Sequence, residues 1–313
     1  MKCRICGNEH ENQTYMTREM MYGFRDPFEY FQCNKCGCLQ ITKYPSNIAK
    51  YYGADYYSYQ STGVHLLEEY LKEKRDKFEI TRKGIIGRLI SRIKPEFGLR
   101  TLFLNLLPLL PKNKDIKILD IGCGWGHFLR LLKQVGFTNL TGVDPFIEND
   151  IVINDHFLIH KKNIDEMSGK FDLIFLNHSL EHMPNQSGVM NSIYNLLSEN
   201  GVCVIKIPLS SSYAWKHYGI NWIQLDSPRH YYLHSENSLK LLAEMANLTV
   251  TGVVYDSTSF QYIGSELYVK DIPKIKGSLH ISRKQIAKYE RMASELNIKH
   301  QGDQAIFFIK LKT

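Results

Sequence analysis

The sequence contains no long hydrophobic run. No stretch of about eighteen consecutive apolar residues occurs in the 313-residue chain, so no membrane-spanning helix is expected. The first ten residues, MKCRICGNEH, contain no apolar segment of the kind found in a secretory signal peptide. We therefore expect a cytoplasmic protein.

Repeats, low-complexity tracts and a strong charge imbalance are also missing. The net charge of +7 is small for this length and does not require an anionic partner. The apolar fraction of 43% and the charged fraction of 23% are typical of a globular protein. The chain is long enough for one large domain and an appendage.

Four of the seven cysteines form two C-x-x-C pairs near the N-terminus. In a reducing compartment this pattern indicates a tetrahedral zinc site more often than disulfides. Gly7 and Gly37 follow the two pairs and suit the left-handed turn of a zinc knuckle. Four thiolates leave no open coordination position, so we expect a structural zinc ion in a small ribbon over residues 1–45. The predicted ligands are Cys3, Cys6, Cys33 and Cys36.

Residues 46–115 form a predicted linker or lid of mixed character. Its tyrosine-rich part, YYGADYYSYQ, contains Tyr56 and Tyr57, which are candidates to close over a substrate or to pack on the core. Residues 82–114 hold eight Lys or Arg and one acid, and apolar residues from Ile85 to Ile93 form one helical stripe. We expect this helix either to pack on the main domain or to contact an anionic membrane, through residues 82–111.

From Lys117 onward, strand-like apolar runs alternate with helical patterns. This alternation predicts a Rossmann-like α/β fold, with a seven-stranded, mostly parallel sheet and helices on both faces. The predicted domain covers residues 116–313, with substrate insertions at 208–235 and 257–304, and its last two strands are expected to pair. The candidate strands are 116–121, 139–144, 156–160, 171–176, 201–207, 249–256 and 305–312.

The segment KILDIGCGWGHFLRLL predicts a strand, a tight glycine turn and the start of a helix. Its third glycine is Gly126, one residue short of the nicotinamide fingerprint, and no G-K-[ST] follows as in a P-loop. The acid before the glycines, Asp120, would repel a pyrophosphate and suits a cationic group. Asp144 ends the next strand, about twenty residues beyond the turn, where a carboxylate can accept both ribose hydroxyls.

Three segments, ILDIGCGWG, GVDP and FDLIFLNHSLEHMPN, resemble those of class I S-adenosylmethionine (SAM)-dependent methyltransferases. The resemblance implies that Asp120, Gly122 and Gly124 lie against the methionine part of SAM, and that Asp144 binds the ribose. The remaining cofactor contacts that it implies are Asn163 and Ile164 at the adenine, Asn177 and His178 at the amino-acid end or the adjacent wall, and Cys123 and Pro145.

The chain also resembles methyltransferases with an N-terminal zinc-binding module, a group that includes deoxysugar C-methyltransferases and enzymes of surface-polysaccharide assembly. Their substrate segment carries an E-H or R-H dipeptide, which here is Arg229–His230 in SPRHYYLHS. The resemblance implies a small carbohydrate-type acceptor, nucleotide-linked or lipid-linked, with SAM and structural zinc as cofactors.

Histidines are the candidates for the catalytic base, because a neutral imidazole can take the proton of a hydroxyl or C–H acceptor. His230 follows the fifth predicted strand and is the first candidate, and His182 in EHMP is the second. Arg229 could hold an anionic substrate group, and Trp222 could stack on a sugar face. Helix capping by the Arg–His pair and core packing of the tryptophan are the structural alternatives.

Two other functions fit parts of the sequence less well. An RNA methyltransferase would need a basic ribbon and an NPPY-like motif, whereas this ribbon mixes acids and bases and the fourth strand reads NHSLEH. We therefore expect no nucleic-acid partner. A non-catalytic scaffold is disfavoured by the intact glycine turn and Asp144. The sequence does not indicate the oligomeric state, nor whether oxygen, nitrogen or carbon is methylated.

Overall fold

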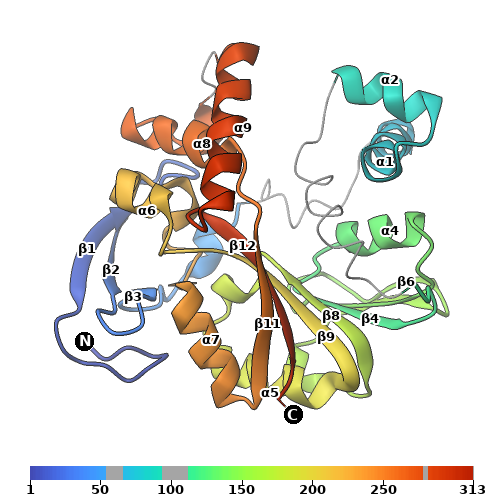
Figure 1. The fold of residues 1–313 in the computed structure, drawn as a ribbon, viewed down its shortest axis with the longest axis horizontal. Coiled ribbons are helices and arrows are strands. Elements are labelled where there is room, and N and C mark those ends of the chain that lie inside the picture. The colour runs from blue at the N-terminus through green and yellow to red at the C-terminus, as the bar shows by residue number, and fades with distance from the viewer. Residues whose placement is uncertain (54–65, 94–111, 278–280, 313) are drawn as a thin grey trace. The chain divides into compact units, whose positions relative to one another are not determined.

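The computed structural model describes residues 1–53, 66–93, 112–277 and 281–312, and the chain forms two compact units (Figure 1). The first unit contains Met1–Gly53, His178–Tyr194 and Val204–Thr313, and the second contains Ala54–Asn177 and Asn195–Cys203. This division differs from the predicted one, because the C-terminal half of the chain shares the first unit with the N-terminal cysteine segment.

The second unit is built on a mostly parallel sheet. Its strands are β4 (Lys117–Ile121), β5 (Asn139–Val143), β6 (Ile151–Asn154), β7 (Phe157–His160), β8 (Phe171–Asn177) and the first part of β9 (Leu197–Pro208). Their hydrogen-bonded order is β9-β8-β4-β5-β7-β6. β4 runs parallel to β5 and β8, β5 runs parallel to β7, and β6 is antiparallel to β7. The buried apolar run of β8 is typical of a strand covered on both faces.

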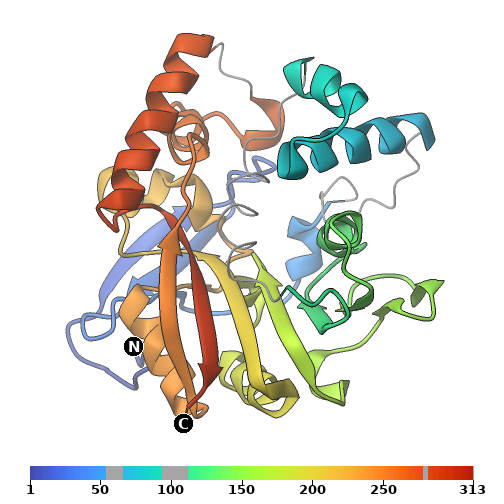
Figure 2. The same ribbon diagram turned by 45° about the vertical axis from the view of Figure 1, so that its right-hand side comes forward.

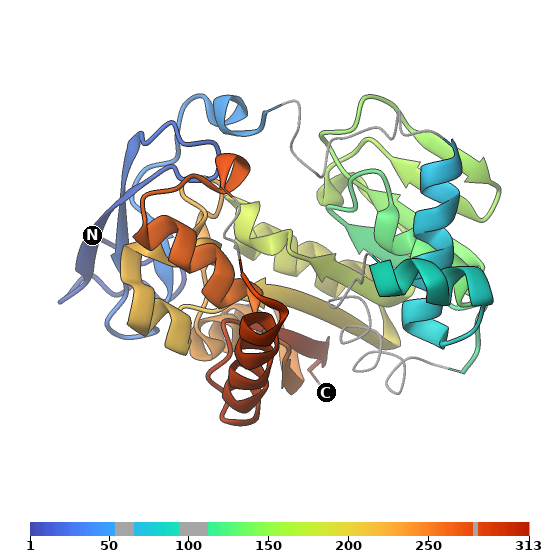
Figure 3. The same cartoon turned by 90° about the horizontal axis from the view of Figure 1, so that it is seen from above.

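Helices complete the second unit. α4 (His127–Gln134) buries its apolar face, which includes Phe128 and Leu132, and the ring of Phe128 meets Phe175 of β8 edge-on at 4.8 Å. α1 (Leu66–Thr81) and α2 (Ile85–Ile93) form a helical hairpin, seen from above in Figure 3. η2 (Ile164–Glu166) is a short 3-10 turn after β7.

The N-terminal part of the first unit is a small antiparallel sheet with the order β1-β2-β3-β10. Its first three strands come from the predicted ribbon, and the fourth comes from residues about 190 positions further along the chain. The ribbon sheet therefore incorporates the predicted substrate segment. The strands are β1 (Gln13–Arg18), β2 (Pro27–Gln32), β3 (Leu39–Ile41) and β10 (Tyr232–Leu233).

The C-terminal part of the first unit continues the α/β architecture. The end of β9 is followed in the sheet by β12 (Gln304–Leu311) and then β11 (Leu248–Tyr255). β11 and β12 pair antiparallel, as predicted, and lie side by side in Figure 2. The helices are α5 (Gln186–Leu196), which begins in this unit, α6 (Tyr213–Tyr218), α7 (Glu236–Met245), α8 (Phe260–Val269) and α9 (Arg283–Ile298).

The Rossmann-like α/β prediction is confirmed. All seven predicted strands are present, and β6 is an additional strand that the sequence analysis did not identify. It is only four residues long, and so short an apolar run does not distinguish a strand from other structure. Among the described residues, no helix is both long and apolar enough to cross a membrane.

Candidate active site and cysteine cluster

The glycine turn between β4 and α4 depends on backbone conformations that glycine favours. Gly122, Gly124 and Gly126 have φ angles of 72°, 51° and 75°, in the left-handed region. A Cβ atom on Gly126 would lie 2.4 Å from Cδ1 of Ile159. The Gly122 N–H donates to the carbonyl of Val143 over 2.8 Å, which ties the turn to the end of β5.

Two buried carboxylates lie beside this turn. Asp144 accepts hydrogen bonds from the N–H groups of Gly124, over 2.8 Å, and Phe146, over 2.9 Å. Burial, reinforced by the charge of Asp144, raises the pKa of Asp120 to about 7. Burial also raises the pKa of Asp144. A nearby cation would favour the ionised form of Asp120, so this carboxylate fits a positively charged group of a ligand.

The other predicted cofactor residues of the second unit lie at or after strand ends. Asn163 precedes η2, and its N–H donates to Glu166 over 2.7 Å. Asn177 ends β8, and its side-chain oxygen is buried without a hydrogen-bond partner among the described residues. The carboxyl ends of parallel strands are where α/β sheets bind ligands. The remaining predicted residues here are Gly122, Cys123, Gly124, Pro145 and Ile164, whereas His178 lies in the first unit.

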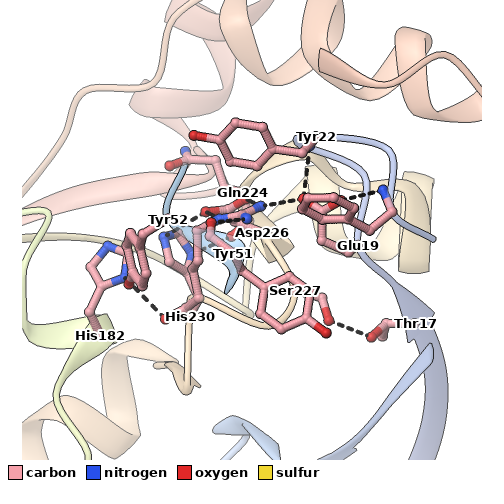
Figure 4. Close-up of polar contacts among 12 residues, drawn as sticks. Thr17, Glu19, Tyr22, Tyr51, Tyr52, His182, Gln224, Asp226, Ser227 and His230 are labelled. Atoms are coloured by element: carbon pink, nitrogen blue, oxygen red, sulfur yellow. Dashed lines mark hydrogen bonds and ion pairs between the residues drawn. The ribbon is translucent and has the colours of Figure 1, made fainter. Parts of the chain in front are cut away.

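The two candidate bases are close neighbours within the first unit. The rings of His182 and His230 meet edge-on, with centroids 4.6 Å apart. Nδ1 of His182 lies 3.0 Å from the carbonyl oxygen of Arg229, and Nδ1 of His230 lies 2.8 Å from that of Gln224. A carbonyl can only accept, so in each neutral ring Nδ1 carries the proton and Nε2 the lone pair. Figure 4 shows both rings beside Tyr52, whose hydroxyl lies 3.1 Å from His182 Nδ1.

Glu181, which the sequence did not indicate as a site residue, belongs to this histidine cluster. Its carboxylate is buried, and Nδ1 of His178 lies 3.3 Å from Oε1. Glu181, His182 and His230 each offer one atom that could bind a metal ion, and these three atoms lie within 4.8 Å of one another. Burial alone would raise the pKa of Glu181, but the contact with His178 and the neighbouring histidine charges lower it to about 2. Its place beside His182 in LEHMP was the only sequence signal.

The acid–base state of this cluster follows from its burial. Burial, together with the charge of the neighbouring His230, lowers the pKa of His182 to about 4. At neutral pH, His182 is therefore neutral and Glu181 is ionised. A buried carboxylate beside imidazoles stabilises any imidazolium that forms there.

Arg229 does not have the substrate-binding position predicted from the sequence. The side chain is fully buried, and its guanidinium forms hydrogen bonds with both oxygens of Asp226, at 2.9 and 2.6 Å. It also donates to Glu19 over 3.1 Å and to the carbonyl of Tyr51 over 2.8 Å (Figure 4). These contacts use its donors inside the protein, so Arg229 holds the loop before His230 rather than a phosphate.

Trp222 is a core residue of the first unit. Trp222 has no exposed surface, and its indole N–H donates to Asp303 over 3.1 Å, so the predicted stacking on a substrate is not supported. Tyr56 and Tyr57 lie outside the described residues. Tyr52 belongs to the same tyrosine-rich segment, and it is this residue that contacts His182.

The N-terminal segment holds the loop that carries His230 through three side-chain contacts. The Tyr30 hydroxyl donates to the carbonyl of His230 over 2.8 Å. Thr17 and Ser227 hydroxyls lie 2.9 Å apart, and Glu19 accepts from Arg229. All three N-terminal residues come from β1, β2 or the turn between them, so this sheet fixes the backbone on which the candidate base stands.

Four cysteine sulfurs form a compact cluster beside this sheet, all within 4.8 Å of one another. Sγ of Cys3 lies 3.6 Å from that of Cys36, and Sγ of Cys6 lies 3.5 Å from that of Cys33. Four sulfurs at about 2.3 Å from a tetrahedral metal ion are roughly 3.8 Å apart, so this spacing fits such an ion.

The backbone around the cysteines has the turns expected of metal knuckles. Gly7 and Gly37 have φ angles of 73° and 76°, and their N–H groups donate to the carbonyls of Cys3 and Cys33. Gln40 donates to Sγ of Cys3 over 2.9 Å, which is the kind of outer contact that orients a thiolate ligand. All seven cysteines are free thiols.

A parallel sheet with a glycine turn and buried acids at its strand ends defines an α/β protein that binds a nucleoside cofactor. The chain matches a family model described as a methyltransferase domain over residues 96–253. The chain belongs to this methyltransferase-domain family.

Curated relatives are similar at low identity. A ubiquinone biosynthesis O-methyltransferase of Pseudomonas aeruginosa is 27% identical over 122 residues, covering 36% of this chain and 52% of that protein. The enzyme of the same name from Psychrobacter cryohalolentis is 24% identical over 170 residues, covering 47% and 65%. The chain thus spans about half to two thirds of the length of these relatives.

Solved structures of SAM-dependent methyltransferases are also similar to this chain. The protein from Mesorhizobium loti has a TM-score of 0.45 and 13% identity, covering 67% of this chain and 97% of that one. The protein from Archaeoglobus fulgidus has a TM-score of 0.42 and 20% identity, covering 72% and 99%.

Proposed function

We propose that this methyltransferase methylates a small carbohydrate-type acceptor, nucleotide-linked or lipid-linked, at a group that must lose a proton. The observation that carries the proposal is the pair His182–His230, whose Nδ1 atoms are held by backbone carbonyls beside the buried Glu181. A neutral imidazole whose Nδ1–H is bound to a carbonyl oxygen presents the lone pair of Nε2, as a general base requires. The resemblance to methyltransferases with a zinc-binding module supports the carbohydrate class.

The residues at the strand ends of the second unit would hold the cofactor. Asp144 is suited to the ribose hydroxyls, and Asp120 to the positively charged part of SAM. The glycine turn lets the backbone approach closely. When bound, SAM supplies an activated methyl group.

His230 is assigned as the base and Glu181 as the group that stabilises its charge. Nε2 of His230 accepts the acceptor proton, and the electron pair of the broken O–H, N–H or C–H bond forms the bond to the methyl carbon. The methyl group would come from SAM, which would keep the electron pair of its methyl–sulfur bond. A pKa of about 4 makes His182 a weak base, so we assign it to orienting the acceptor.

The four clustered cysteines are proposed to hold one structural zinc ion. A site closed by four thiolates has no position for a substrate, so its contribution is to fold the ribbon sheet. Through the contacts of Tyr30, Thr17 and Glu19, the folded ribbon sheet would hold the His230 loop in place.

The test is release of S-adenosylhomocysteine by purified protein with SAM and a panel of nucleotide sugars. We expect turnover with a sugar acceptor, and a loss of at least a hundredfold in His230→Ala. SAM affinity, measured by calorimetry, should be unchanged in that variant. His217→Ala, a change on α6 of the same unit, serves as the matched control. Full activity of His230→Ala would contradict the assigned base.

A second candidate acceptor is a phenol with a lipid tail, which the names of the Pseudomonas and Psychrobacter relatives favour. A phenol hydroxyl needs the same proton removal, so the histidine cluster suits it equally. Adding a short-chain polyprenyl phenol to the panel separates the candidates. Turnover with the phenol alone would replace the carbohydrate class and leave the assigned base unchanged.

A further inference from the structure

The helical hairpin of the second unit packs through the small residues of α2. A Cβ atom on Gly87 would lie 2.1 Å from the carbonyl oxygen of Lys74 and 2.6 Å from Cβ of Phe78, both on α1. The hydroxyl of Ser91 donates to the carboxylate of Glu79. Gly87 and Ser91, one turn apart, therefore form the face of α2 that contacts α1.

The apolar stripe of α2 points away from this contact. Ile85 and Ile93 are 81% and 80% exposed, and Ile86 and Leu89 are about half exposed. These side chains belong to the stripe recognised in the sequence, and each keeps about half or more of its surface exposed. A stable water-facing helix normally exposes its polar side, so the arrangement is inverted.

Cations border the exposed stripe. Arg88 and Arg92 are exposed on α2, between the apolar stripe and the face against α1, and Arg82 and Lys83 precede the helix. No Asp or Glu occurs in residues 82–93. A short helix with an apolar face bordered by Arg and Lys is the pattern of helices that lie in the interface of an anionic bilayer.

We infer that α2 is an interfacial helix that attaches the protein to the surface of an anionic phospholipid bilayer. The four apolar side chains enter the boundary between headgroups and acyl chains, and the arginines contact lipid phosphates. α1 supports the helix from behind through Gly87 and Ser91. The inference does not depend on the identity of the methyl acceptor.

The test is co-sedimentation of the full-length protein with vesicles. We expect binding to phosphatidylcholine vesicles containing 25–30% phosphatidylglycerol, roughly the anionic fraction at which basic helices respond, and little binding to phosphatidylcholine alone. Ile85→Ser/Leu89→Ser/Ile93→Ser should lose at least tenfold in partitioning. Ile298→Ser/Val152→Ser is the matched control, because these side chains are also largely exposed but lie on α9 and β6.

The charges are tested separately, in a variant that keeps the apolar stripe. Each cation near an anionic surface contributes about fivefold to partitioning, so Arg88→Gln/Arg92→Gln should weaken it by roughly twentyfold and reduce its dependence on salt. Equal binding of both variants and wild type, or no wild-type binding at low salt, would overturn the inference.

Insertion of the helix is tested by fluorescence. Leu89→Trp places an indole on the stripe, whereas Trp215 and Trp222 are buried and Trp125 lies half-buried in the glycine turn. We expect brominated acyl chains to quench this variant more strongly than wild type. Concentration-dependent self-association without lipid, removed by the triple serine variant, would instead assign the stripe to contact between copies and contradict the proposal.

Discussion

The hydroxyl of Tyr30 donates a hydrogen bond to the backbone carbonyl of His230 over 2.8 Å, although 200 positions separate the two residues. Tyr30 is fully buried on β2 of the ribbon sheet. A buried carbonyl that loses its donor is costly, so the bond fixes the loop at the candidate base. The N-terminal module thereby holds the backbone on which the candidate base stands.

Removing this hydroxyl should affect both stability and turnover. We expect Tyr30→Phe to lower the free energy of unfolding by about 1–3 kcal/mol, because the carbonyl of His230 becomes a buried acceptor without its partner. Turnover should fall while SAM affinity is retained. Chemical denaturation and calorimetry measure the two effects. Tyr15→Phe is the control, since that ring packs on Trp215 from the adjacent strand, and equal losses in both variants would contradict the role given to Tyr30.

Replacing one of the clustered cysteines should abolish turnover but leave SAM binding intact. Cys36→Ser removes one predicted ligand, and we expect the zinc content to fall from one ion per chain to well below one. Turnover should be lost, whereas SAM should still bind, because its predicted residues lie in the second unit apart from His178. Cys38→Ala is the control, as this buried thiol lies outside the cluster of four. A full complement of zinc in Cys36→Ser would refute the ligand set.

Replacement of Arg229 distinguishes its structural role from substrate binding. Arg229→Met leaves the carboxylates of Asp226 and Glu19 without their buried cation, which typically costs about 3–5 kcal/mol. We expect a large fall in the melting temperature, measured by calorimetry with and without acceptor. Arg229→Lys keeps the charge but not the two-point contact, so an intermediate loss is expected. A stable Arg229→Met protein with only a raised KM would instead support contact with the substrate.

The buried Asp120 predicts how cofactor affinity depends on pH. Its pKa is about 7 in the cofactor-free protein, and the cationic cofactor favours the ionised form. SAM affinity should therefore rise by up to about tenfold per pH unit below pH 7 and level off above it. The cofactor-free protein should show the opposite trend in stability, since the folded state retains a proton that the unfolded chain releases between about pH 4 and 7.

Calorimetric titration between pH 5.5 and 8.5 measures this dependence. Asp120→Asn should bind SAM more weakly and with little change over this range, while Asp165→Asn, an exposed residue of the same unit, should behave as wild type. A rise in affinity that persists in Asp120→Asn would assign the titration to another group.

The fold could be predicted largely from local sequence patterns. The strands at 117–121 and 171–177 are mostly apolar, and the glycine turn has a spacing that a backbone with positive φ angles requires. β6 was missed because it is only four residues long, and so short an apolar run does not identify a strand. The pairing of β10 with β3 depends on residues far apart in the chain, which no local period can reveal.

The sequence indicated which histidines lie at the site better than it indicated what the neighbouring residues do there. His182 and His230 were identified as imidazoles near a strand end, and the structure brings their rings together. Arg229 was misjudged because a charged residue next to a candidate base suggests a ligand contact, whereas its partners Glu19 and Asp226 become apparent only in three dimensions. Glu181 was overlooked for the same reason, since its burial is a tertiary property.

The β3–β10 pairing also sets the order in which the protein can be completed during synthesis. The four clustered cysteines precede β10 by about 200 residues, and the outer edge of β3 has no partner until residues 232–233 have left the ribosome. An unpaired strand edge is a site of aggregation. A nascent chain whose cysteines already hold a metal would therefore remain vulnerable until β10 emerges, and a chain truncated before residue 232 would leave this edge of the sheet unpaired.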